Sequence, residues 1–127
     1  MSGAGTPRLV LLDSVTQVEP RHAGCIVVTG SHGGASVVRY ARTVPALLYV
    51  FNDAGVGKDE AGVAALTALE EAGVAAATVS HATARIGEAK DSWEHGVVSR
   101  ANAQARSLGV HAGLALRDVP ALRLAND

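Results

Sequence analysis

Three apolar runs, each followed directly by a polar cluster that contains glycine or small residues, constrain the fold of this sequence most. The runs cover residues 25–29, 46–51 and 74–79 and consist almost wholly of apolar side chains. Short continuous runs of this kind are typical of strands covered on both faces, as in parallel sheets. The segments between them have helical patterns, so the sequence predicts βαβ units with right-handed crossovers.

We therefore predict one domain of the α/β class, a small three-layer α/β/α domain around a mostly parallel sheet of four or five strands. The chain has 127 residues, which suits a single hydrophobic core. Asp59 is expected to cap the helix after the second run, and Gly73 to end it. The other expected elements are a first strand over 8–12, helices over 35–43, 60–72 and 96–108, a polar connection over 81–95, a strand or irregular segment over 113–117, and loose tails over 1–7 and 120–127.

Charge and composition argue against several classes of partner. The net charge is −1 with acidic and basic residues interspersed, and aromatic residues make up 3% of the chain. Neither feature suits a nucleic-acid-binding face, so no nucleic acid is expected as a partner. No apolar run approaches the ~20 residues that a membrane-spanning helix needs, and no signal peptide is recognisable, so no membrane partner is expected. The single cysteine, Cys25, fits a reducing cytoplasm.

The three polar clusters are the candidate functional site. If the runs form neighbouring parallel strands, the clusters meet at one edge of the sheet, where open α/β sheets bind ligands. A small anionic molecule is the expected partner. The candidate catalytic residues are Ser31, His32, Asp53 and His81. The candidate substrate-binding residues are Gly33, Gly34, Asn52, Gly55, Thr83, Arg85, Ser99 and Asn102.

The first cluster, Gly-Ser-His-Gly-Gly at 30–34, lies where a strand would turn into a helix. Glycines there let backbone N–H groups approach a ligand, and the helix that follows favours an anion. The spacing differs from the P-loop, from the dinucleotide fingerprint and from the nucleophile elbow of hydrolases, so no cofactor is expected. A tight turn with a hydrogen-bonded serine is the structural alternative.

The second and third clusters carry the charged side chains. Asp53 directly follows a buried run and could be a base, a metal ligand or a group that orients a histidine. Gly55 and Gly57 indicate unusual backbone angles in the same cluster. In the third cluster Arg85 suits the capture of a carboxylate or phosphate. Structurally, the side chains of Asn52 and Asp53 could instead form a turn, and Arg85 could pair with Glu88 or Glu94.

These residues are compatible with three chemistries. Ser31 could be a nucleophile with a histidine as base and the Gly33 and Gly34 amides as oxyanion hole. A metal could bind His32, Asp53 and His81, although their spacing fits no known motif. We favour the third, which needs no cofactor: an anion site beside Asp53 or a histidine that moves a proton, as in a lyase, isomerase or hydrolase of a small acid.

Two alternatives concern assembly rather than chemistry. The same clusters could serve a non-catalytic subunit that binds a small anion within a larger assembly. Separately, residues 60–72 are apolar on nearly all sides, whereas a surface helix normally has one apolar stripe. A homo-oligomer that buries this helix is therefore expected, although alanine is also a good helix former on exposed surfaces.

Ser99 and Asn102 are three residues apart and would share a face of the helix over 96–108.

Overall fold

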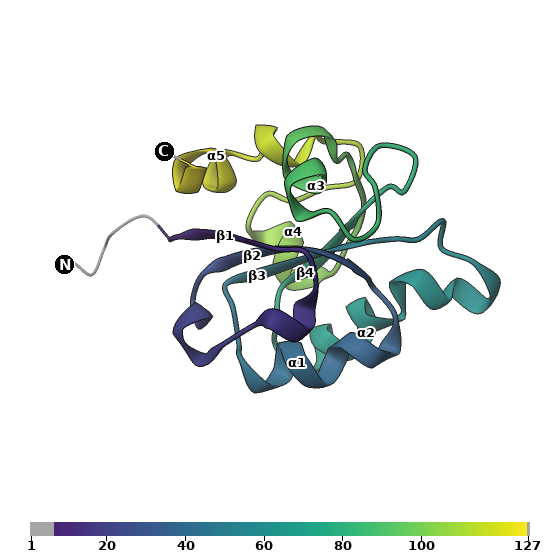
Figure 1. Ribbon diagram of the computed structural model, residues 1–127, viewed down its shortest axis with the longest axis horizontal. Helices are drawn as coiled ribbons and strands as arrows, with labels where there is room; N and C mark the ends of the chain where they lie inside the picture. The colour runs from purple at the N-terminus through teal and green to yellow at the C-terminus, as the bar shows by residue number, and fades with distance from the viewer. Residues whose placement is uncertain (1–6, 127) are drawn as a thin grey trace.

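The computed structural model describes residues 7–126, which form a three-layer α/β/α domain (Figure 1). A sheet of five strands in the order β1-β2-β3-β4-β5 forms the middle layer. The first four strands are parallel and β5 is antiparallel to β4. The predicted α/β class and the mostly parallel sheet are confirmed. The strands are β1 (Leu9–Leu12), β2 (Ile26–His32), β3 (Leu48–Asn52), β4 (Ala76–Val79) and β5 (Val98–Ala101).

Helices cover both faces of the sheet (Figure 1). The helices α1 and α2 pack on one face, where Tyr49, Phe51 and Leu69 are fully buried. The helices α3, α4 and α5 pack on the other face, where Trp93 of α3 shares a core cluster with Val28 and Val50 of the sheet. Because the central strands are covered on both sides, every position along β3 is buried, as its apolar sequence predicts. The helices are α1 (Val38–Thr43), α2 (Ala64–Glu71), α3 (Ala89–His95), α4 (Ala103–Ser107) and α5 (Pro120–Asn126).

The helix predicted over 96–108 is wrong, because this stretch contains β5 and the short helix α4. Gly96 lies against β4: a Cβ added to Gly96 would lie 2.8 Å from Cγ1 of Val79. This close approach lets the following residues, which include a β-branched pair, join the sheet. The Asn102 side chain then accepts a hydrogen bond from the Ala105 N–H and starts α4 as its N-cap.

The helix predicted over 60–72 is shorter than expected. A 3₁₀ segment, Lys58–Val63, precedes α2, and Asp59 and Glu60 have left-handed backbone angles within it. Asp59 lies inside this segment, the N-cap positions of the segment and of α2 belong to Gly57 and Val63, and neither cap makes a side-chain hydrogen bond, so the capping role expected for Asp59 is wrong. Gly73 does follow the last turn, with φ of +79° and its N–H bonded to the carbonyl of Glu70.

Three further differences concern the connections. The polar connection over 81–95 contains α3. Residues 113–117 contain one bridge, between Ala115 and Val97, and the start of a 3₁₀ helix, Leu116–Asp118. Residues 120–126, expected to be a loose tail, form α5, whose Leu122 is buried against the core. The expectation for 1–6 and for 127 lies outside the described residues. Within 7–126, no helix is both long and apolar enough to cross a bilayer.

Candidate functional site

The carboxyl ends of β2, β3 and β4 lie side by side and bring the three polar clusters to one edge of the sheet. His32 on β2 is in register with Asn52 on β3, and Asn52 is in register with Val79 on β4. Adjacent strands are about 4.8 Å apart, so the residues that follow these positions are neighbours. The common edge expected from the sequence is therefore present, and Ser31 and His32 belong to β2 itself rather than to the turn after it.

Asp53 and His81 form a pair at this edge. The Asp53 side chain is 5% exposed, and its Oδ1 accepts hydrogen bonds from the N–H groups of Gly55 (2.8 Å) and His81 (3.0 Å). Nδ1 of the His81 ring lies 3.4 Å from the same oxygen. This is an ion-pair distance rather than a hydrogen bond, and it places the Asp53 carboxylate beside the His81 imidazole.

The Asp53 carboxyl is held in its ionised form. Burial raises its pKa, but the Gly55 N–H, the Ser99 hydroxyl, the His81 N–H and the His81 ring together lower the pKa below the usual value. The His81 ring is 60% exposed and its face lies over Gly55, where an added Cβ would be 3.5 Å from the ring. The buried, ionised Asp53 carboxylate therefore lies beside the exposed His81 imidazole.

His32 is fixed by a different contact. Its Nδ1 accepts a hydrogen bond from the Gly34 N–H at 3.0 Å. The Gly33 N–H donates to the carbonyl of Asn52 at 2.9 Å. Both amides that the oxyanion-hole hypothesis requires are thus used within the chain, and an added Cβ on Gly33 would lie 2.7 Å from the carbonyl of Gly62. In this conformation the glycines serve the packing of the turn.

Two adjoining hollows open at this edge. One has a volume of about 490 Å³ and contains His81, Arg85 and Glu88 on its wall. The other, of about 400 Å³, contains His32. Ala54 and Ile86 line both hollows, and the Ile86 side chain is 53% exposed. Sequence reasoning missed both residues, because an alanine and an isoleucine in a loop carry no chemical signal by themselves.

Arg85 is available to a ligand. Its side chain is 81% exposed, and Nη1 lies 3.9 Å from Glu88. This pair is the structural alternative considered for Arg85, but an exposed pair at that distance contributes little to stability. The backbone holds the residue in place, because the Arg85 N–H donates to Oδ2 of Asp91 at 2.8 Å.

Several other predicted site residues make hydrogen bonds inside the fold. Oδ1 of Asn52 accepts from the Ala54 N–H and its Nδ2 donates to the carbonyl of Ala84, so this fully buried amide ties two of the loops together. The Thr83 hydroxyl donates to the carbonyl of Ser80 and accepts from the Val97 N–H. Both side chains therefore stabilise the loops that form the site.

Ser31, Ser99 and Asn102 are also engaged. The Ser31 hydroxyl accepts from the Val15 N–H at 2.9 Å, and within residues 7–126 no hydrogen bond joins it to an imidazole. Ser99 lies on β5 with its hydroxyl 2.9 Å from that of Thr78. Asn102 caps α4, so the helix face that Ser99 and Asn102 were expected to share does not exist.

The metal alternative is not supported by the geometry. Within the described part of the chain, no three His, Cys, Asp or Glu side chains lie close enough to hold a metal ion. His32, Asp53 and His81 lie at neighbouring strand ends, but Asp53 directs its carboxylate at His81 and at backbone N–H groups.

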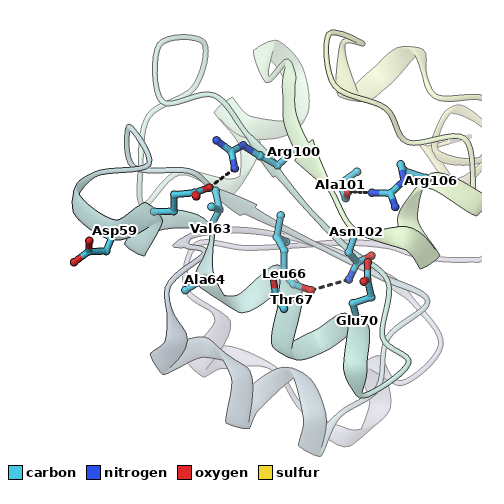
Figure 2. A pocket seen from close by; sticks show the side chains of 11 residues that line it. Asp59, Val63, Ala64, Leu66, Thr67, Glu70, Arg100, Ala101, Asn102 and Arg106 are labelled. Carbon is cyan, nitrogen blue, oxygen red and sulfur yellow. Dashed lines mark hydrogen bonds and ion pairs between the residues drawn. The ribbon is translucent and has the colours of Figure 1, made fainter.

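A separate groove of about 610 Å³ lies between α2 and β5 (Figure 2). Several of its polar side chains bind partners within the fold: Arg100 pairs with Glu60, and Arg106 donates to the backbone carbonyl of Ala101. Nδ2 of Asn102 donates to the carbonyl of Leu66 (Figure 2). The sequence did not predict this groove, because β5 was expected to be a helix.

The loop after β3 has an unusual backbone. Gly55 and Gly57 have φ of +78° and +74°, as their positions in the sequence indicate. Four non-glycine residues in the same loop also have positive φ, namely Ala54, Val56, Asp59 and Glu60. Left-handed angles are costly for such residues and concentrate at functional sites. The sequence does not predict these four positions, because glycine is the residue whose presence indicates a positive φ.

Comparisons with known proteins identify no relative. No protein-family model matches the chain, and neither a curated protein nor a solved structure matches it. Function therefore has to be argued from the site itself.

Proposed function

We propose that this protein is an enzyme that acts on a small carboxylate- or phosphate-bearing molecule by acid/base chemistry at the carboxyl edge of the sheet. The observation that carries the proposal is the pairing of the buried Asp53 carboxylate with the exposed His81 imidazole, at 3.4 Å, on the wall of a hollow that also contains Arg85. Histidine is the side chain best suited to proton transfer near neutral pH.

In this proposal each group has one task. The Arg85 guanidinium binds the anionic group of the substrate. Nε2 of His81 accepts a proton from the substrate, or from a water molecule that lies beside a carbonyl group of the substrate. The Asp53 carboxylate stabilises the imidazolium that forms, and His81 then returns the proton to the product. Lyase, isomerase and hydrolase reactions all use such a step.

A second candidate function is a non-catalytic subunit that binds a small anion within a larger assembly. The exposure of the site favours it, because the His81 ring is 60% exposed and Arg85 is 81% exposed. An enzyme of this class normally excludes water from the reacting groups. If the protein is an enzyme, a partner protein over the open hollow would exclude water from the reacting groups. If it is a subunit without catalytic activity, the open hollow would serve only to bind the anion.

A thermal-shift screen tests the anion site on which both candidate functions depend. Wild type, Arg85→Ala and the matched control Arg42→Ala, an exposed arginine on α1, are heated with small carboxylates, phosphates and divalent metals. Stabilisation by an anion that is lost in Arg85→Ala and kept in Arg42→Ala would support the anion site. Stabilisation by a metal alone would contradict the anion site, and no response to any compound would contradict anion binding by the isolated chain and leave only an accessory role that needs a protein partner.

We also propose a homo-oligomer in which α2 is buried by a second copy of the chain. The inner face of α2 packs within the domain, where Ala65, Leu66 and Leu69 are buried. The outer face offers Ala64 and Thr67, small side chains that permit a close approach of another helix. Light scattering at micromolar concentration tests this proposal, and a monomeric mass would refute it.

We also propose that the protein resides in a reducing compartment such as the cytoplasm. Cys25, the single cysteine of the chain, is free and buried. Such a thiol needs no oxidising environment for folding. Cell fractionation tests this location, and recovery of the protein outside the reducing compartments would contradict it.

A further inference from the structure

The role of His32 is not explained by the proton-transfer pair. The Gly34 N–H donates to Nδ1 of His32 at 3.0 Å, so Nδ1 acts as the acceptor of the ring. In a neutral imidazole the other nitrogen then carries the hydrogen. His32 therefore presents Nε2–H as a hydrogen-bond donor whose orientation the turn has fixed in advance.

The hollow that contains His32 is otherwise apolar. Its volume is about 400 Å³, and among residues 7–126 His32 is the only one on its wall with a polar side chain. The remaining lining residues are glycine, alanine, valine and isoleucine: Gly34, Ala35, Ala54, Val56, Gly57, Ala61, Gly62 and Ile86. An apolar hollow with one oriented donor suits a hydrocarbon group that ends in an oxygen acceptor.

This hollow adjoins the one that contains His81. Ala54 and Ile86 line both, and the half-exposed Ile86 side chain gives the boundary an apolar surface. His32 lies at the end of β2 and His81 beyond the end of β4, two strand spacings away, which corresponds to about 10 Å. One elongated small molecule can therefore contact both imidazoles.

We propose that the His32 hollow is the second half of the substrate site and that it selects elongated acids. The reacting, anionic end of the substrate lies at His81 and Arg85, its hydrocarbon part lies on Ala54 and Ile86, and a second oxygen acceptor binds Nε2–H of His32. This inference rests on the proposed function, and it names the substrate class as small bifunctional acids with an apolar middle.

The test compares ligands that differ only at the far end. Dicarboxylates from malonate to suberate are titrated, each beside the monocarboxylate of the same carbon number, while the imidazole NMR signals of His32 and His81 are followed. We expect a dicarboxylate of matching length to shift both sets of signals and to bind about tenfold more tightly than its monocarboxylate, the effect of one additional hydrogen bond.

Two variants separate the ligand contact from the structural one. His32→Asn keeps an oxygen that can accept the Gly34 N–H but has no donor at the position of Nε2. His32→Gln reaches the position of Nε2 with an amide N–H but gives up the contact with Gly34. The preference for dicarboxylates should be lost in His32→Asn and kept in His32→Gln.

The outcomes distinguish this inference from the proposed function. Acids that shift the His81 signals with no preference for dicarboxylates and no shift at His32 would overturn the inference and leave the proposed function standing. A preference that survives in His32→Asn would also overturn it. If no acid shifts the His81 signals, the proposed function fails, and the inference fails with it.

Discussion

Replacement of Asn102 by alanine tests whether this buried amide is part of the framework or part of a ligand site. Its Oδ1 accepts hydrogen bonds from the N–H groups of Ala76 (3.0 Å) and Ala105 (3.1 Å). Its Nδ2 donates to the carbonyls of Leu66 (3.2 Å) and Val74 (2.9 Å). The single side chain thus connects α2, β4 and the start of α4.

The size of the effect follows from those contacts. A neutral hydrogen bond contributes about 1 kcal/mol, and a buried backbone group that loses its partner costs about 1–3 kcal/mol. Asn102 makes four such bonds and is 4% exposed, so we expect Asn102→Ala to lower the free energy of unfolding by about 4 kcal/mol. That is a large part of the roughly 5–15 kcal/mol that stabilises a domain.

Urea unfolding followed by tryptophan fluorescence measures this loss, because Trp93 is the single tryptophan and is buried in the core. Gln104→Ala is the matched control on α4, since the Gln104 amide makes one exposed bond, to the carbonyl of Glu70. The control should lose about 1 kcal/mol or less. A loss below about 1 kcal/mol in Asn102→Ala as well would refute the framework role and return Asn102 to the candidate ligand contacts.

Three further predictions concern the edge of the sheet. Gly33→Val should prevent folding, not only ligand binding, because even a Cβ would lie 2.7 Å from the carbonyl of Gly62; a native circular dichroism spectrum would contradict this. Asp53→Asn should be less stable than wild type at neutral pH. Because the pKa of Asp53 is lowered in the folded state, that difference should shrink as the pH falls below about 4, and a constant difference between acid and neutral pH would argue against an ionised Asp53. Ala54→Gly should raise the free energy of unfolding by about 1 kcal/mol by removing left-handed strain. The exposed Ala72, with φ of −84°, is the matched position where the same change should destabilise, and equal effects at both would count against strain.

Much of the framework follows from the sequence because strand burial has a direct signature. Continuous apolar runs predict β2, β3 and β4, and their parallel order brings the polar clusters together. The edge strand β5 was missed, because Ser99 and Arg100 break its apolar pattern and the segment also fits a helix. Its place in the sheet depends on the close packing of Gly96 against Val79, a tertiary contact that local propensity does not contain.

The candidate site was predictable in position and less so in the roles of its residues. The end of a buried strand predicts that Asn52, Asp53 and His81 lie at the common edge, and the structure places all three there, while their roles in a site stay predictions. The sequence does not distinguish a carboxylate beside a histidine from an amide whose two polar atoms bind the backbone. That difference depends on hydrogen-bond partners that are distant in the sequence, such as Ala84 for Asn52.

Binding of small acids at the carboxyl edge of the sheet, beside His81 and Asp53, can be mapped through backbone amide shifts by NMR, with the best stabilising acid from the thermal-shift screen as the ligand. We expect saturable shifts at residues 53–56 and 81–86, and their loss in Arg85→Ala. Shifts confined to 63–67 and 100–106, which line the groove between α2 and β5, would place binding elsewhere and contradict binding at this edge.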